Sequence, residues 1–164
     1  MADKRWWMGF EGKMYIALGL GITDTKNMTE FEHVKDPKIG IAFDDVEVTL
    51  RIHKGVKAYE KGLVDYPISF SCPNVKDVTI LNNITSYSEP EDIGIIKTAL
   101  FARHQPISIM MVDPDGDGFV GDYYVFTGDK TEEAADAQQF ECEAKPSGVG
   151  KGVKRLINHV IVED

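Results

Sequence analysis

The sequence lacks the features that mark several large classes of protein. It has two cysteines in 164 residues, too few for a disulfide framework or a cysteine-rich metal site. No apolar run approaches the length of about 18 residues that suggests a membrane span, and no basic-then-apolar leader is present. Nucleophile-elbow, P-loop and dinucleotide-binding motifs are also missing. We therefore expect a non-enzymatic protein that needs no cofactor and has no membrane partner.

Acidic residues outnumber basic ones, 27 to 18. The net charge is −9 and the isoelectric point is near 4.9, which argues against a protein that grips nucleic acid, because phosphate binding depends on lysine and arginine. An acidic protein can still be one that nucleic acid slides past. The stretch from Lys151 to His159 is basic, with Lys151, Lys154 and Arg155. It predicts either a tail that docks on the acidic body of a neighbouring copy or a merely solvated tail.

The segment Ile107–Phe126 supports two incompatible interpretations. Four residues match the start of a calcium-binding EF-hand loop: Asp113, Asp115, Asp117 and Gly118. Position 12 of that loop is Tyr124, however, and a phenol cannot replace the bidentate glutamate that completes the calcium shell. The flanks alternate with a period of two and carry β-branched and aromatic residues, which is typical of strands. We therefore predict an acidic hairpin turn with no metal, and keep the three aspartates as weak calcium candidates.

The remaining periodicity predicts a mainly β (α+β) fold: a β-sandwich or barrel of six or more antiparallel strands with one flanking helix. The predicted strands cover residues 13–20, 39–52 (one long strand or a bulged pair), 65–72, 107–112, 120–126 and 138–145. Residues 21–33 and 53–63 are predicted as loops. Cys72 and Cys142 fall on the apolar register of their strands, which favours two buried core thiols.

One helix is predicted over Glu91–His104. Ser88 and Glu91 have the spacing of a capping box, and Pro90 falls in the first turn. An apolar stripe follows, and Pro106 prevents the helix from continuing.

The order of these elements resembles the tail tube proteins of long-tailed bacteriophages and prophages, the major tail proteins. The resemblance covers about residues 12 to 146 and depends on the order of short motifs: Gly12-Lys13, Val34-Lys35-Asp36, Thr49-Leu50-Arg51, the segment Gly62–Phe70, the helix, Pro106-Ile107, Asp113–Gly118 and Phe140–Pro146. It implies one tail-tube-like domain over residues 1–164, with an N-terminal arm (about 1–11) and a C-terminal tail (about 147–164).

The resemblance also implies a function. Tail tube proteins are virion structural proteins, assembled in the host cytoplasm, that form hexameric rings; the rings stack into a tube through which DNA is ejected. The implied partners are further copies of the chain, tape-measure and terminator proteins, and DNA that passes without specific binding. Assembly candidates are Trp6 and Trp7 in the arm and Lys151, Lys154 and Arg155 in the tail. Three alternatives stay open: the tube protein of a related secretion or contractile injection system, a calcium-binding β-module, and a small-molecule enzyme.

Overall fold

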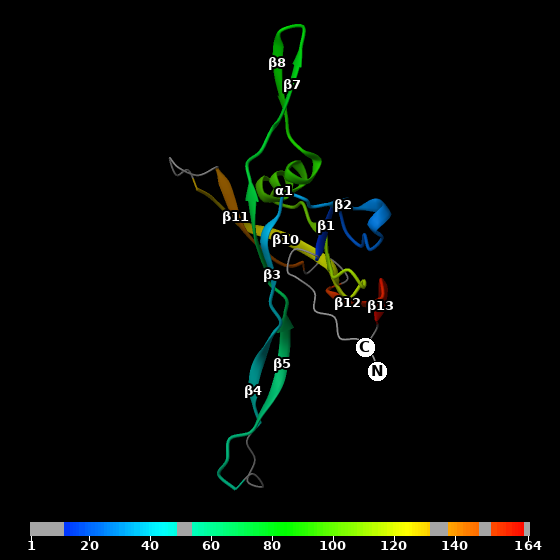
Figure 1. The fold of residues 1–164 in the computed structure, drawn as a ribbon. Coiled ribbons are helices and arrows are strands. Elements are labelled where there is room, and N and C mark those ends of the chain that lie inside the picture. Colours follow the sequence, from blue (N-terminus) through cyan, green and yellow to red (C-terminus); the bar gives the residue numbers. More distant parts are fainter. Residues whose placement is uncertain (1–11, 49–53, 132–137, 148–151, 163–164) are drawn as a thin grey trace, which may run out of the picture.

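A computed structural model describes residues 12–48, 54–131, 138–147 and 152–162. Most of these residues lie in antiparallel strands, and a single α-helix, α1 (Glu91–Phe101), accompanies them (Figure 1). The strands are β1 (Lys13–Leu18), β2 (Thr29–Glu30), β3 (Lys35–Ile39), β4 (Ala42–Glu47), β5 (Tyr59–Asp65), β6 (Ile68–Pro73), β7 (Asp77–Leu81), β8 (Ile84–Ser88), β9 (Ile107–Val112), β10 (Gly118–Thr131), β11 (Gln139–Pro146), β12 (Lys154–Ile157) and β13 (Val160–Val162). A 3₁₀ turn, η2 (Thr25–Asn27), precedes β2.

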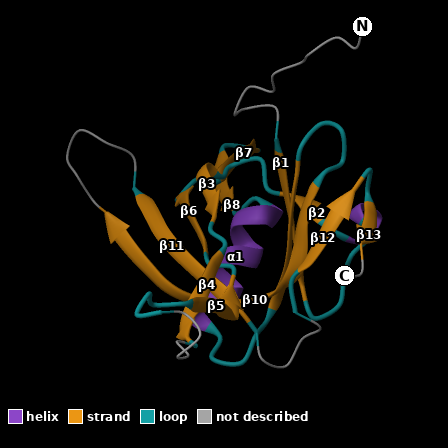
Figure 2. Cartoon of the chain, turned by 90° about the horizontal axis from the view of Figure 1, so that it is seen from below, coloured by secondary structure: helices purple, strands orange, loops and turns teal. Residues whose placement is uncertain are grey.

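Nine strands form the main sheet, in the order β2-β1-β9-β10-β11-β6-β3, with β12 paired to β10 and β13 paired to β12. Every pairing in it is antiparallel. The sheet curls around α1, with β11 and β6 on one side of the helix and β1 and β2 on the other (Figure 2). The predicted mainly β class with one flanking helix is confirmed. Among the described residues, no helix has the length and apolar character needed to cross a membrane.

The core lies between α1 and the concave face of the sheet. Ile93 and Ile96 of the helix are fully buried and pack with Ile16, Ile109 and Tyr123 from the sheet. Burying one such aliphatic side chain contributes about 1.5–3 kcal/mol, so these contacts hold the helix in the sheet. A smaller cluster covers the opposite face, where Met110, Val112 and Val120 pack with Leu156 of β12. Residues in β9 are therefore buried on both faces, which hides the simple alternation expected of a half-exposed strand.

The helix begins where the sequence predicts but is capped differently. Ser88 ends β8, and Pro90 is the N-cap with no side-chain cap hydrogen bond, so the predicted capping box is wrong. The first turn is instead tied to the segment before β3. The Asp92 carboxylate lies 2.7 Å from the His33 ring Nδ1 and accepts from its backbone N–H, and Thr29 donates to Glu91. Acids at a helix N-terminus are favoured by the helix dipole. The helix ends at Phe101, three residues before the predicted end, because Ala102 is extended.

Two hairpins project from opposite ends of the main sheet (Figure 1). One is β4–β5, so the predicted loop over residues 53–63 is wrong from Tyr59 onward. The other is β7–β8, where the sequence predicted no strands. The predicted C-terminal tail also needs correction, because β12 pairs with β10 and β13 pairs with β12. The N-terminal arm and the motif Thr49-Leu50-Arg51 lie outside the described residues.

Candidate assembly surfaces

The acidic segment Asp113–Gly118 is a hairpin turn between β9 and β10, as predicted. The Asp113 N–H donates to the Asp117 carbonyl at 2.8 Å, and the Gly116 N–H donates to the Asp113 carbonyl at 2.9 Å. Gly116 has a φ of +87°, and a Cβ there would lie 2.4 Å from the His159 ring. The conformation and the close approach therefore both require glycine. In the described part of the chain, no three His, Cys, Asp or Glu side chains are grouped to hold a metal ion.

This turn contacts the C-terminal hairpin of the same chain. The Asp117 carboxylate accepts from the Asn158 N–H at 3.0 Å, and the Gly116 carbonyl accepts from the His159 N–H at 3.0 Å. Lys154 and Arg155 belong to β12, where Lys154 is half-buried opposite Val120 and Arg155 is exposed. These two assembly candidates thus lie on a strand of the main sheet and not in a free tail. Trp6, Trp7 and Lys151 lie outside the described residues.

A buried polar cluster fixes the segment after β1. Asp122 of β10 is 3% exposed, and its carboxylate accepts from the Gly21 N–H at 2.8 Å and lies 3.0 Å from the Ser108 hydroxyl. The Ser108 hydroxyl also accepts from the Ile22 N–H at 3.2 Å. A buried carboxylate with these partners stabilises one loop conformation, because a carboxylate or a backbone N–H that is buried without a hydrogen-bond partner destabilises the fold. The Gly21–His33 segment thus starts from a fixed position.

Burial makes both thiols unreactive. It raises the pKa of Cys72 to about 12, with the nearby Cys142 and Asp92 adding to the effect, and it raises the pKa of Cys142 to about 11. Both side chains belong to the core, as predicted. Because the thiolate is the reactive form, neither cysteine is activated as a nucleophile at neutral pH.

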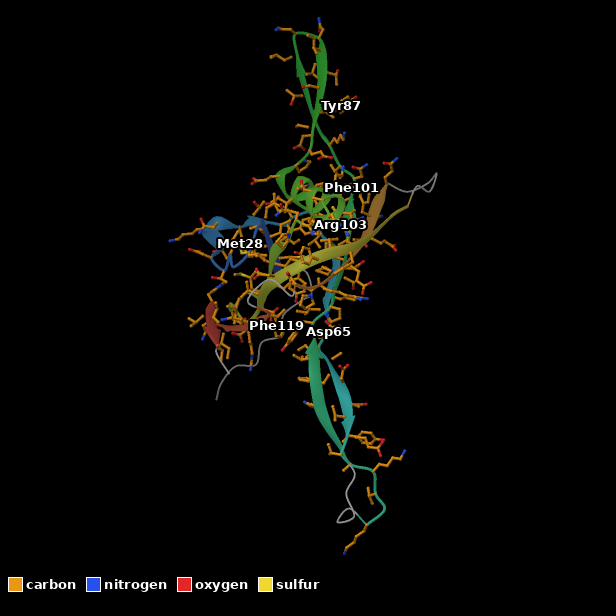
Figure 3. The ribbon with its side chains drawn as sticks, turned by 180° about the vertical axis from the view of Figure 1, so that it is seen from behind. Met28, Asp65, Tyr87, Phe101, Arg103 and Phe119 are labelled. Atoms are coloured by element: carbon orange, nitrogen blue, oxygen red, sulfur yellow. The ribbon has the colours of Figure 1, made fainter. Side chains whose placement is uncertain are left out.

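The β7–β8 hairpin exposes a group of large apolar side chains. Every side chain of both strands is exposed. The register pairs Val78 with Tyr87 and Ile80 with Thr85, so these four side chains share one face. Val78, Ile80 and Tyr87 are 56%, 70% and 67% exposed. The other face carries Asp77, Thr79, Ser86 and Ser88, with Leu81 and Ile84 at the tip. Figure 3 shows Tyr87 on the hairpin, away from the body of the protein.

An isolated two-stranded hairpin is marginally stable in water, and an exposed apolar face normally marks a contact surface. The sequence signal for this hairpin is Asn82-Asn83, both with positive φ, between two runs of β-branched residues. Asparagine tolerates this conformation, so the pair predicts a tight hairpin turn. The sequence predicted no strand between residue 72 and the helix, so this hairpin was missed.

The β4–β5 hairpin presents a mixed surface. Phe43, Val64 and Tyr59 share one face with the charged Asp45 and Lys61, and the Lys61 ammonium lies 4.5 Å from the centre of the Phe43 ring. Every described side chain of β4 is exposed. The hairpin therefore offers both apolar area and charge.

Part of one edge of β10 has no strand partner in the described residues. Gly118 pairs with both Val112 of β9 and Leu156 of β12, and Tyr123 pairs with both Ile107 of β9 and Pro146 of β11. Strand β9 thus runs along one edge, and β12 and β11 follow the other. Because β9 begins at Ile107, residues 124–131 have no strand partner on that edge in the described part of the chain. Their sequence, YVFTGDKT, contains no proline.

The outer edge of β3 is protected by contrast. It contains Pro37 and an irregularity between Lys35 and Lys38. Proline, charge and bulges are the devices that prevent strand addition at an edge. The β3 edge therefore lacks the features of a pairing surface, whereas residues 124–131 of β10 contain no proline on their unpartnered edge.

Comparison with known proteins shows the fold to which these surfaces belong. The sequence matches no protein-family model and no curated protein. The structure is similar to a chain in the tail of an empty gene transfer agent particle refined with C6 symmetry, with a TM-score of 0.62 at 13% identity over 88% of this chain and 96% of that one. It is also similar to the SPP1 tail tube, with a TM-score of 0.60 at 14% identity over 86% and 76%. A chain of the anti-feeding prophage baseplate matches with a TM-score of 0.57 at 5% identity over 90% and 94%. The chain has the tail tube fold.

Proposed function

We propose that the protein is a structural subunit of a phage or prophage tail tube. Six copies close into a ring, and rings stack into a tube through which DNA passes into the host. The observation that carries this proposal is that the fold likeness spans 88% of this chain and 96% of a tail chain arranged with C6 symmetry. A match of this extent concerns the whole architecture and not one shared motif.

The exposed surfaces support self-association. A monomer would leave the β10 edge unpaired and the apolar face of β7–β8 in water, and both are hazards for a soluble chain. In a closed ring, each copy presents one surface to the next copy and a different surface to the previous one, so no such surface is left over. The ring therefore removes both problems with a single arrangement.

The charge supports passage of DNA without binding. With a net charge of −9, the acids of the chain outnumber the cations that could contact phosphates. An acidic wall would repel the duplex and leave it mobile. In this proposal the protein has no enzymatic activity and needs no cofactor; it lies in the virion tail after assembly in the host cytoplasm. Tape-measure and terminator proteins would contact the inside and the end of the tube.

Electron microscopy of the purified chain over a range of concentrations tests the proposal. We expect rings or tubes with six-fold symmetry in averaged images. A chain that stays monomeric at the highest concentration, by both microscopy and light scattering, would contradict self-assembly.

A second candidate is the tube protein of a contractile injection or secretion system, favoured by the likeness to the anti-feeding prophage chain. Fold cannot separate the two functions, since one architecture serves both. The neighbouring genes can: capsid and tape-measure genes would indicate a virion, whereas secretion ATPase genes without capsid genes would indicate an injection device.

A further inference from the structure

We propose that Lys97 of α1 sets the direction in which the β7–β8 hairpin projects, and so positions its apolar face for the next copy. This inference rests on the proposed function. The Lys97 ammonium donates to the Asn74 side-chain carbonyl at 2.8 Å and also contacts the Glu89 carboxylate. Asn74 lies between β6 and β7, and Glu89 lies between β8 and α1. One side chain therefore joins the two ends of the hairpin.

In the described part of the chain, the two strands of the hairpin pair only with each other. It forms a separate two-stranded sheet, and all its side chains are exposed. Figure 1 shows it standing clear of the body beyond α1. Its orientation must then be decided at its base, where the chain enters and leaves.

The entering segment is fixed to the main sheet. The Asn74 N–H donates to the Gln138 carbonyl at 2.8 Å, and the Asn74 side-chain amide donates to the Gln138 side chain at 2.9 Å. Gln138 directly precedes β11. Lys97 contacts Glu89 in the segment that leaves the hairpin and Asn74 in the segment that enters it. Because both segments are then held by one side chain, the two ends of the hairpin cannot turn independently.

The position of Lys97 suits this role. Side chains on a helix tilt toward its N-terminus, so Lys97 points toward the segment from which the hairpin enters α1. Its side chain is 19% exposed, and its ammonium lies 5.7 Å from the centre of the Phe140 ring. Water and salt screen the electrostatic interactions of a partly shielded ammonium less than those of a fully exposed lysine. Its three N–H donors allow it to hold two acceptors at once.

Spin labels test the inference on the full chain below its assembly concentration. Labels at Thr79→Cys on the hairpin and Glu141→Cys on β11 report the hairpin direction by dipolar electron paramagnetic resonance, and the native thiols are buried and unlabelled. We expect Lys97→Met and Glu89→Gln to broaden the distance distribution. The matched control Lys145→Met, which removes the same charge from an exposed site on β11, should leave it narrow.

The exchange Lys97→Glu with Glu89→Lys restores the ion pair but not the donor to Asn74, so it should narrow the distribution in part, which a role in packing alone would not do. In assembling protein, the single variants should raise the concentration needed for rings by about twofold to fivefold, as expected for a partly exposed ion pair. An unchanged distribution in a folded Lys97→Met protein would overturn the inference. If the wild type forms no rings, the proposed function fails, but the spin-label result still decides the role of Lys97.

Discussion

Removing the apolar face of the β7–β8 hairpin should abolish assembly at ordinary concentrations without unfolding the chain. The change is Ile80→Ser together with Tyr87→Ser. Both side chains are already exposed in the single chain, at 70% and 67%. Surface substitutions of this kind usually alter the free energy of unfolding by no more than about 0.5 kcal/mol. We therefore expect a melting temperature within about 2 °C of the wild type.

The effect on assembly follows from the same exposed fractions. Full burial of a large apolar side chain contributes about 1.5–3 kcal/mol. Because about two thirds of each side chain is exposed in the single chain, burying it in an interface should contribute about 1–2 kcal/mol per side chain. Losing both side chains then costs each interface about 2–4 kcal/mol. Since about 1.4 kcal/mol corresponds to a tenfold change in an equilibrium constant, the concentration needed for rings should rise roughly 30- to 900-fold.

Light scattering against concentration measures this threshold, and negative-stain images confirm which species forms. The control exchanges two polar residues on the other face of the same hairpin, Thr79→Ser with Ser86→Thr, and should leave the threshold unchanged. The reasoning is refuted if the Ile80/Tyr87 variant is folded and assembles at the wild-type concentration, because the apolar face would then not be buried between copies.

Four further outcomes are expected. Asp122→Ala leaves the Gly21 N–H without its acceptor, which should cost about 1–3 kcal/mol and lower the melting temperature by about 2–12 °C in a thermal scan; an unchanged melting temperature would contradict the buried cluster. Low millimolar calcium should leave the melting temperature unchanged, whereas a rise of several degrees that Asp115→Ala abolishes would restore the calcium interpretation. Alkylating reagent should leave Cys72 and Cys142 unmodified in the native chain at pH 8, and any fast labelling would show that they are accessible. The same two thiols keep their protons in the folded state up to about pH 11–12, whereas the unfolded thiols lose theirs near pH 9. The free energy of unfolding should therefore be insensitive to these groups below pH 9 and fall between pH 9 and 12, and denaturant titrations that show a rise across that window would refute the assignment.

Local patterns of the sequence were sufficient for the elements whose two faces differ in polarity or whose turn residues are explicit. Asp113–Gly118 was correctly predicted as a turn because no glutamate completes the calcium loop and the flanks have strand periodicity. The helix start was correct, since Pro90 and the following acids favour it. The predicted capping box was wrong. The first turn is held instead by hydrogen bonds between Asp92 and His33, a residue far away in the sequence.

The β7–β8 hairpin shows a different limit. Its Asn82-Asn83 turn was readable from the sequence, but its fully exposed apolar face contradicts the assumption that alternation marks contact with the chain's own core. A strand whose partner is another copy carries the same pattern as a strand of the core. The role of Lys97 was beyond sequence analysis, because its acceptors are 23 and 8 residues away and meet only at the base of the hairpin.

The sequence by itself determined the class of fold, the acidic turn, the buried thiols and an acidic charge that disfavours nucleic-acid binding. These depend on composition and on patterns within about 20 residues, where periodicity and turn chemistry act directly. Only the tertiary structure decided that Lys154 and Arg155 lie on a strand paired with β10, that the β3 edge is protected while part of the β10 edge has no strand partner in the described residues, and that two hairpins leave the body. Each of these is a relation between distant segments, set by strand order and register, which no local pattern specifies.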